Sequence, residues 1–167
     1  MKKELSKNLK IYILMTKICI VSSSGGHLTE IRTLKNIYQN YPHFYIINSL
    51  IKLPKDMSGI SYFISHSERD FKFFYNIFEC FLILLKEKPD LIISTGAGAI
   101  VPCSFIGKIF RIKILYIETI TRIKKPSLTG RIMYYLSDCF IYQWKDLKKY
   151  FPKGIYGGQI LWQLLFL

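Results

Sequence analysis

The sequence predicts an α/β fold with a Rossmann-like parallel sheet flanked by helices. Short apolar runs rich in β-branched residues alternate with longer segments of helical periodicity along the 167 residues, which is typical of parallel sheets buried on both faces. Two of the apolar runs lead into glycine-containing loops and then into a helix, as in proteins that bind ligands at the carboxyl ends of strands. The length fits one domain that can bury a core without disulfides or a metal ion.

Six strands are predicted, each from a short apolar run bounded by turn residues. In chain order the runs are ICIV, FYII, SYFI, LIIS, ILYI and CFIY, at residues 18–21, 44–47, 61–64, 91–94, 114–117 and 139–142. The segments between and after them predict helices at residues 28–41, 69–88, 101–110, 129–136 and 145–150. We expect residues 17–167 to form the single domain, preceded by a basic and apolar segment at residues 1–16.

The chain is both basic and apolar, with a formal net charge of +13 and 50% hydrophobic residues. This excludes a disordered charged tail and suits nucleic acid, an anionic membrane surface or an acidic phosphate-bearing ligand. The cysteines stand singly, without a second Cys or a His at ligand spacing (Cys19, Cys80, Cys103 and Cys139). We interpret them as buried apolar side chains of a reducing compartment, and we predict no metal site.

Two segments are candidates for contact with a membrane. Residues 1–16 contain several lysines and an apolar run at residues 11–15 that is too short to span a bilayer. Residues 71–85 are apolar nearly all round, and a helix of that length would cover about 22 Å of a hydrocarbon core of about 30 Å. This helix either packs against the sheet or lays an exposed apolar face in the membrane interface. We predict a peripheral protein at the cytoplasmic face of the cell membrane.

The loop after the first strand has the features of a phosphate site. Ser24, Gly25 and Gly26 allow a tight turn at a helix start, where unpaired N–H groups and the helix dipole attract an anion. His27 closes the loop and adds a group that titrates near neutral pH. The alternative is a plain strand-to-helix turn with a serine cap.

A second loop of small residues, Gly96, Ala97 and Gly98, follows the strand at residues 91–94. If the two strands are neighbours, two helix N-termini converge on one place, which suits a pyrophosphate. Neither loop matches a P-loop or a G-x-G-x-x-G fingerprint, so nucleotide hydrolysis and hydride transfer are disfavoured and no cofactor is predicted.

Glu118 and Arg122 follow the strand at residues 114–117 and are candidates for the same cleft. A carboxylate there can bind sugar hydroxyls or act as a base, or it can pair with Arg122 or a lysine. Arg122 would place positive charge near a phosphate. A solvated basic face explains the lysines beside it equally well.

The C-terminal part of the chain suggests a docking surface. Gln143 and Trp144 come directly after the last predicted strand, and Gly157 and Gly158 precede an apolar tail. We assign these four residues as candidates for binding a partner protein. The alternative is a last helix that folds back on the core.

Several motifs occur together in an order that resembles one family. They are VSSSGGHL at residues 21–28, KPDLIISTG at residues 88–96, YIE at residues 116–118, Arg122, KPSLTG at residues 125–130 and FIYQW at residues 140–144. This set resembles the bacterial capsular-polysaccharide relatives of the membrane-recruiting subunit of the two-part UDP-N-acetylglucosamine transferase. The resemblance covers nearly all of residues 17–159.

The resemblance implies that the chain is equivalent to the N-terminal domain of a GT-B glycosyltransferase. A separate small subunit would then bind the UDP-sugar, and this chain would recruit it to the membrane and be nearly inactive alone. The two loops would hold a polyprenyl-diphosphate-linked sugar, with His27 and Glu118 as the candidates for activating its hydroxyl. The reaction would be a metal-independent inverting transfer.

Two other classes of function compete with this interpretation. One is a non-catalytic scaffold that only tethers a self-sufficient transferase to the membrane. The other is a nucleic-acid-binding protein, which would need a basic stripe interleaved with exposed aromatic residues or a reading helix. The sequence has glycine loops at strand ends instead, so we predict no nucleic-acid partner.

Overall fold

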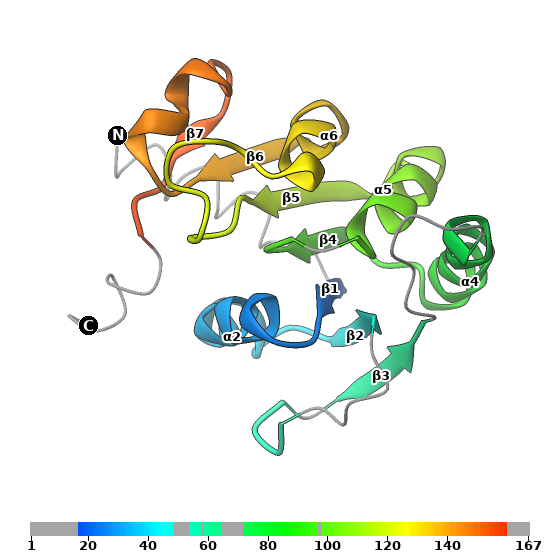
Figure 1. Cartoon of the computed structure of the whole chain (residues 1–167). Coiled ribbons are helices and arrows are strands. Elements are labelled where there is room, and N and C mark those ends of the chain that lie inside the picture. The colour runs from blue at the N-terminus through cyan, green and yellow to red at the C-terminus, as the bar shows by residue number, and fades with distance from the viewer. Residues whose placement is uncertain (1–16, 49–53, 58, 65–71, 97, 160–167) are drawn as a thin grey trace.

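The computed structural model describes residues 17–48, 54–57, 59–64, 72–96 and 98–159. These residues contain a seven-stranded sheet of order β3-β2-β1-β4-β5-β6-β7, in which all neighbouring strands are parallel. The strands are β1 (Ile18–Ser23), β2 (His43–Asn48), β3 (Ile60–Phe63), β4 (Leu91–Ser94), β5 (Lys113–Ile117), β6 (Cys139–Tyr142) and β7 (Ile155–Tyr156). The predicted Rossmann-like parallel sheet is confirmed (Figure 1).

Helices cover both faces of this sheet. They are α2 (Gly26–Thr33), α3 (Lys35–Tyr38), α4 (Lys72–Glu87), α5 (Ile100–Ile109), α6 (Leu128–Leu136) and the short 3₁₀ helix η1 (Lys145–Lys149). Side chains of α2 and α3, including Ile31 and Tyr38, belong to the core on one face. Side chains of α4, α5 and α6, including Leu84 and Met133, belong to the core on the other face. Figure 1 shows α2 on one side of the strands and α4 and α5 on the other.

The helices that follow β1 and β4 lie on opposite faces of the sheet, although the two strands pair with each other in its middle. The chain leaves β1 toward α2 on one face, and it leaves β4 toward α5 on the other. A crevice forms outside the carboxyl ends of strands at such a switch point, and ligands of open α/β sheets bind there. The condition set for the two glycine loops, that their strands are neighbours, is therefore met.

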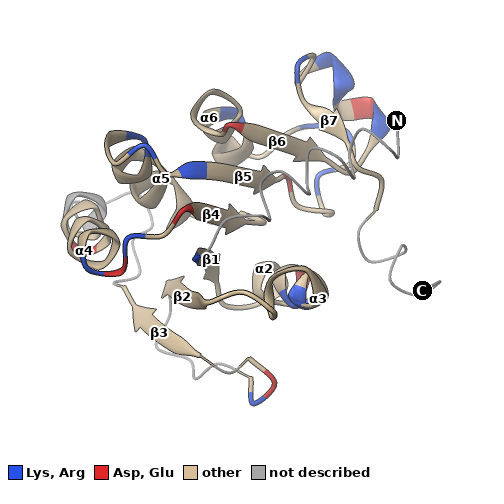
Figure 2. Ribbon diagram, turned by 180° about the vertical axis from the view of Figure 1, so that it is seen from behind, with Lys and Arg blue, Asp and Glu red and all other residues tan. Residues whose placement is uncertain are grey.

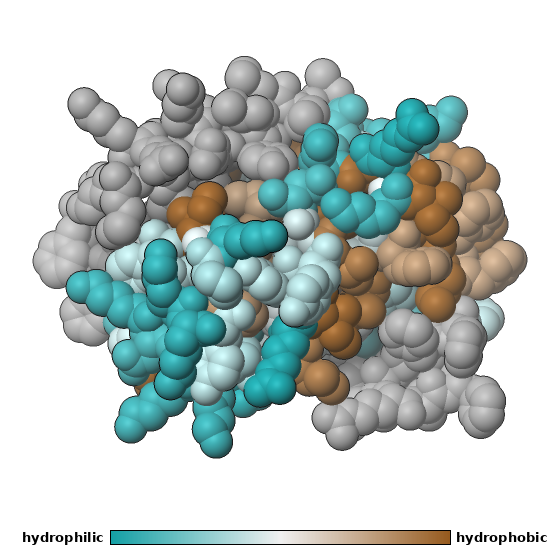
Figure 3. Space-filling view, turned by 90° about the horizontal axis from the view of Figure 1, so that it is seen from above, coloured by the Kyte–Doolittle hydropathy of each residue, from teal (hydrophilic) through white to brown (hydrophobic). Residues whose placement is uncertain are grey.

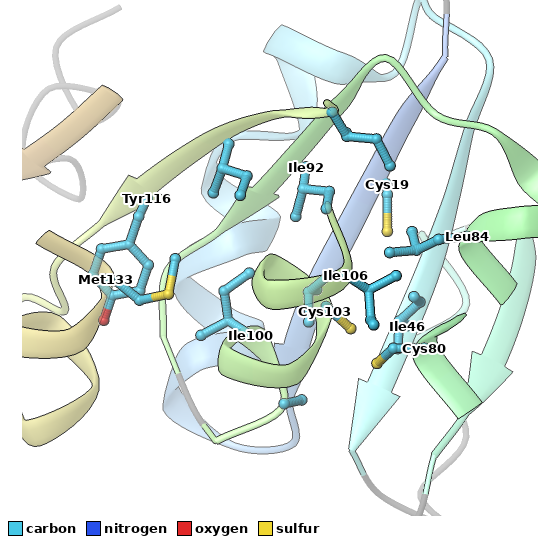
Figure 4. Close-up of a cluster of buried hydrophobic side chains, with 14 of the residues drawn as sticks. Cys19, Ile46, Cys80, Leu84, Ile92, Ile100, Cys103, Ile106, Tyr116 and Met133 are labelled. Atoms are coloured by element: carbon cyan, nitrogen blue, oxygen red, sulfur yellow. The ribbon is translucent and has the colours of Figure 1, made fainter. Parts of the chain in front are cut away.

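The cysteines are part of the core, as predicted. All four are free and buried, and Figure 4 shows Cys19, Cys80 and Cys103 within the cluster beneath α4 and α5. Burial raises the pKa of the Cys19 and Cys103 thiols well above their ordinary value and that of Cys139 to about 11. These thiols therefore act as small apolar side chains.

Two predicted helices differ from the structure, and one strand was not predicted. The helix expected at residues 28–41 is two helices, because the Thr33 hydroxyl donates to the Glu30 carbonyl (2.6 Å) and the Leu34 N–H donates to the Ile31 carbonyl (3.1 Å) in a tighter turn. The segment at residues 145–150 forms the 3₁₀ helix η1. The seventh strand, β7, has two residues, too few to give an apolar-run signal.

The helix expected at residues 69–88 forms as α4, with apolar residues on both a buried and an exposed side, and contact of the exposed side with a membrane stays a prediction. Cys80 and Leu84 are buried against the core, whereas Phe78 and Leu82 are about half-exposed. The inner side therefore packs on the sheet and the outer side remains apolar and accessible. No helix among the described residues is long and apolar enough to cross a bilayer. Residues 1–16, the other candidate membrane segment, lie outside the described residues.

Candidate functional site

The two glycine loops meet through His27. His27 Nδ1 lies 3.1 Å from the Thr95 carbonyl oxygen, and the Thr95 hydroxyl donates to the His27 carbonyl at 3.0 Å. Because a carbonyl only accepts hydrogen bonds, Nδ1 carries the proton in this contact. Among the described residues, Nε2 makes no hydrogen bond, and in the neutral imidazole it is the atom that can accept a proton.

The glycines of the two loops have different tasks. At Gly96, where φ is +132°, a Cβ atom would lie 2.6 Å from Cε1 of His27. Only glycine therefore allows the second loop to approach the imidazole this closely. Gly25, at φ +84°, and Gly26 have no atom within 4 Å of an added Cβ. The first loop thus borders open space on the side where a ligand would lie.

The helix starts around this place differ in their caps. Neither α2, which follows Gly25, nor α5, which follows Ala99, has a side-chain cap. The N-terminus of α6 is capped by Ser127, whose Oγ accepts from the Gly130 N–H at 2.7 Å. The uncapped helix starts leave N–H groups for an anionic ligand. Gly98 is exposed in the loop before α5, and Ala97 lies outside the described residues.

Glu118 is fully buried and its carboxylate is held by the chain itself. Its oxygens accept from the Ser127 hydroxyl (2.9 Å), the Ser127 N–H (3.2 Å) and the Thr119 N–H (3.0 Å). Burial raises the pKa of Glu118, and the hydrogen bonds from Ser127 oppose that shift. A Cβ at Gly130 would lie 1.8 Å from Oε2. The Glu118 carboxylate is therefore held by hydrogen bonds from Ser127 and Thr119 rather than by the expected pairing with Arg122 or a lysine.

Glu30 belongs to the site although the sequence did not single it out. Its side chain is buried, and Oε1 accepts from the Ile120 N–H (2.6 Å) and the Thr119 hydroxyl (3.2 Å). Its other oxygen, Oε2, lies 3.7 Å from His27 Nδ1. The signal in the sequence is the spacing His-x-x-Glu at the start of the predicted helix, and because α2 begins at Gly26 both side chains lie on one helical face.

The loop between β5 and α6 completes the site. Ile120 of this loop accepts a hydrogen bond from Trp144 Nε1 (2.6 Å) in addition to its contact with Glu30. Arg122 and the neighbouring Lys124 and Lys125 are exposed. The loop is therefore anchored at its base, and its basic side chains are free to face a phosphate.

The candidate residues for partner binding are placed differently from one another. Gln143 is buried, and its amide donates to the Glu118 carbonyl at 3.0 Å, so its side chain is not on the surface. Trp144 is half-buried. Gly157 donates to the Tyr142 carbonyl at 3.0 Å beside β7, and Gly158 has φ +73°. Trp144 and the two glycines therefore remain accessible at the edge of the domain.

Solved structures with the same fold place this domain in a class. The chain superposes on MurG of Acinetobacter baumannii with a TM-score of 0.61 at 15% identity, over 76% of this chain and 40% of that one. It superposes on a UDP-N-acetylglucosamine 2-epimerase of Rickettsia bellii with a TM-score of 0.70 at 13% identity, over 90% of this chain and 47% of that one. The fold is thus that of one half of a GT-B protein, and the chain spans less than half of these structures' length.

Sequence comparison then identifies the family. The family described as "Oligosaccharide biosynthesis protein Alg14 like" matches residues 59–160. The UDP-N-acetylglucosamine transferase subunit ALG14 of mouse is 31% identical over 182 aligned positions, which cover 87% of this chain and 83% of the mouse protein. The human protein of the same name is 32% identical over 86% of this chain and 82% of its own length. The chain belongs to the Alg14 family.

The approach of Gly96 to His27 can be tested by substitution. Gly96→Ala should lower the free energy of unfolding by about 1–3 kcal/mol, because the added Cβ forces the imidazole and the loop apart. Gly26→Ala is the matched control and should change stability little, since its Cβ meets open space. Urea unfolding of the two variants measures this difference. Equal stability of Gly96→Ala and the unmodified chain would contradict the assigned contact.

Proposed function

We propose that this chain is the acceptor-side subunit of a two-component UDP-sugar glycosyltransferase that builds a capsular or other extracellular polysaccharide. The acceptor would be a polyprenyl-diphosphate-linked sugar. Membership of the Alg14 family and a fold that matches one half of GT-B proteins support this proposal. The observation that carries it is the imidazole of His27, fixed between two uncapped helix starts at the β1/β4 switch point.

The site has the groups that such an acceptor needs. The diphosphate would occupy the N–H groups at the starts of α2 and α5, beside Ser24, Gly25, Gly26, Gly96, Ala97 and Gly98. Arg122, exposed on the loop between β5 and α6, would add positive charge. The acceptor sugar would then lie against His27, whose Nε2 is the side of the imidazole not tied to Thr95.

The chemistry follows from this placement. The acceptor hydroxyl gives its proton to His27 Nε2, its oxygen forms a bond to C1 of the donor sugar, and the bond from C1 to UDP breaks with inversion. No covalent intermediate is needed. Holding acceptor and donor together supplies much of the rate.

Of the two candidate bases, we favour His27. Glu118 is fully buried and accepts hydrogen bonds from Ser127 and Thr119, so a hydroxyl would have to displace these bonds to reach it. We assign Glu118 the task of holding the start of α6 and the loop that carries Arg122. His27 is half-buried and has one ring nitrogen bonded to Thr95, which fixes the ring and leaves the other nitrogen for the substrate.

The UDP-sugar would come from a separate small glycosyltransferase subunit. Support comes from the mouse and human relatives, which are themselves named subunits and over 80% of whose length this chain covers. Trp144, Gly157 and Gly158 are the accessible candidates for the interface, with Gln143 supporting them from inside the domain. We propose that docking there brings the donor to the open side of His27.

Reconstitution tests the proposed function directly. We expect the chain and a candidate donor-binding subunit from the same genome to form a stable complex that transfers sugar from its UDP donor to a lipid-diphosphate acceptor. Each subunit alone should be at least about tenfold slower, because neither holds both substrates. The measurement is product formation from radiolabelled donor. Full activity of the partner alone would favour the competing scaffold function, and failure to associate would contradict the proposal.

The assignment of the base gives a second prediction. His27→Ala should lower kcat at least about tenfold without dissociating the complex, which is the usual effect of removing a positioned base. Glu118→Gln should instead lower the free energy of unfolding by about 1–3 kcal/mol, because it disturbs a buried hydrogen-bond network, while kcat per folded complex changes only a few-fold. The reverse pattern would make Glu118 the base.

The outer side of α4 and α5 is the surface that we propose contacts the membrane. Tyr75, Phe78, Leu82 and Leu85 recur along α4 at helical spacing and are 48–57% exposed. Phe105 and Ile109 on the adjacent α5 are 52% and 61% exposed. We call these six residues the apolar helix face. Its apolar side chains are too many and too close together to be scattered surface residues.

Charge at the border of the apolar helix face favours an anionic lipid surface as its occupant. Lys86 and Lys108 lie in the last turns of α4 and α5, and Lys88 and Arg111 follow them and are exposed. Figure 2 shows both helices as mostly uncharged, and Figure 3 shows apolar residues gathered on the side where α5 lies, opposite a hydrophilic side. Apolar insertion beside basic residues is how peripheral proteins bind the interface. We therefore propose a peripheral position on the cytoplasmic face of the membrane.

Vesicle binding tests this surface. Replacing Phe78 and Leu82 together by serine should lower the partition coefficient onto phosphatidylglycerol-containing vesicles at least about tenfold, since each buried side chain contributes about 1.5–3 kcal/mol. Phe63→Ser is the control. Phe63 is exposed on β3 and pairs with Ile47 of β2, and Ile47 belongs to the core on the face of the sheet away from α4 and α5. Co-sedimentation measures binding. Equal loss in the control and the double variant would contradict the proposal.

A further inference from the structure

We infer that Glu30 is a positioning residue for the His27 imidazole and stabilises its protonated form during transfer. The inference rests on the proposed function for its catalytic consequence, but the contact itself does not depend on that function. It starts from the contrast between the two oxygens of one buried carboxylate. One oxygen accepts hydrogen bonds from a neighbouring loop, and the other faces the imidazole.

Oε1 is the oxygen that accepts hydrogen bonds from the loop between β5 and α6. It accepts from the Ile120 N–H at 2.6 Å and from the Thr119 hydroxyl at 3.2 Å. These bonds tie α2 to the loop between β5 and α6. If Glu30 served only to hold this loop, a neutral amide oxygen at the same place would suffice.

The other oxygen, Oε2, is buried and has no hydrogen-bond partner among the described residues. Leaving a buried carboxylate oxygen without a donor is costly, so its position calls for an explanation. The Glu30 side chain is only 7% exposed, and its Oε2 lies 3.7 Å from Nδ1 of the His27 imidazole. The pair is one helical turn apart on α2, so the helix backbone fixes its spacing.

The carboxylate acts on the imidazole in two ways. In the neutral ring, it favours the tautomer with the proton on Nδ1, which Thr95 also requires because its carbonyl accepts from that atom. When Nε2 takes the proton of the acceptor hydroxyl, the ring becomes a cation. A carboxylate 3.7 Å from Nδ1 then stabilises that charge, and its burial limits screening by salt.

This arrangement also links His27 to the loop that bears Arg122. The same carboxylate contacts the imidazole through Oε2 and the loop through Oε1. The base and the loop with the positive side chain proposed for the diphosphate are therefore both in contact with Glu30. Glu30 does not itself reach the open side of the ring, so it positions and stabilises without touching the substrate.

The experiment compares Glu30→Gln with Thr119→Val. Glu30→Gln keeps an oxygen for the Ile120 N–H and removes the charge facing His27. Thr119→Val removes one hydrogen bond to Oε1 and leaves Oε2 unchanged, so it reports the structural contribution alone. The first readout is the tautomer of the neutral His27 ring, measured from imidazole nitrogen chemical shifts on the whole chain without a partner. The second is kcat and KM of the reconstituted pair.

We expect the unmodified chain and Thr119→Val to hold the Nδ1–H tautomer, and Glu30→Gln to hold it to a measurably smaller fraction, because only the Thr95 carbonyl then favours it. In the reconstituted pair, Glu30→Gln should lower kcat at least about tenfold with KM for the acceptor changed less than about threefold. It should have no further effect when added to His27→Ala, since the two residues act as one unit.

The outcomes separate this inference from the proposed function. If the pair transfers no sugar but the tautomer depends on Glu30, the proposed function fails and the contact stands. If Glu30→Gln and Thr119→Val behave alike in both readouts, Glu30 is a structural residue and the inference is overturned. If Glu30→Gln does not fold, the unmodified chain still decides, because a neutral ring protonated on Nε2 would contradict the inference by itself.

Discussion

The reciprocal hydrogen bonds between His27 and Thr95 hold the site together. They join the loop after β1 to the loop after β4 with distances of 3.1 and 3.0 Å. These loops can meet only because β1 and β4 are neighbours at the point where the chain changes faces of the sheet. Gly96 permits the approach, because any larger residue would occupy the space of the imidazole. The orientation of the ring, and thus the nitrogen offered to a ligand, follows from this contact.

Two buried carboxylates extend this arrangement to the third loop. Glu118 binds Ser127 and so fixes the start of α6, whereas Glu30 binds Ile120 and so fixes the middle of the same loop to α2. Buried carboxylates are costly unless their oxygens are satisfied. Glu118 meets this condition through hydrogen bonds from Ser127 and Thr119. Glu30 meets it with one oxygen only, and the second oxygen faces His27. The difference separates a carboxylate that serves the fold from one that we assign to the base.

The proposed acceptor and membrane surfaces are compatible on one domain. The acceptor loops lie at the carboxyl ends of β1 and β4, and the apolar helix face covers the outer side of α4 and α5. A lipid-linked acceptor has its diphosphate at the membrane surface and its lipid inside. A domain that rests on the membrane through these helices can therefore receive the diphosphate at its edge. Membership of the Alg14 family, whose mouse relative is named a transferase subunit, is consistent with our proposal that the donor site belongs to another protein.

The local sequence determined the secondary structure and the chemical types at the site. The apolar runs predicted six of the seven strands. The Ser-Gly-Gly-His and Gly-Ala-Gly loops led to the hypothesis of an anion site, which stays a prediction. Apolar runs predict strands because a strand of a parallel sheet is buried on both faces, so that its consecutive residues are apolar. The sequence pattern did not predict the break at Leu34 or the two-residue strand β7. A turn bonded through the Thr33 hydroxyl and a strand of that length produce no recognisable run of apolar residues.

Only the tertiary structure decided which polar side chains belong together. The sequence offered Glu118 as an accessible carboxylate and Gln143 as a surface residue, but both are buried, because the loops around them are folded over by contacts distant in the chain. Glu30 and Thr95 entered the site for the same reason, since hydrogen bonds across 90 and 68 positions join them to Ile120 and His27. The sequence thus specified the groups available for chemistry. The packing of distant segments decided which of them are exposed, which are paired and which one faces the imidazole.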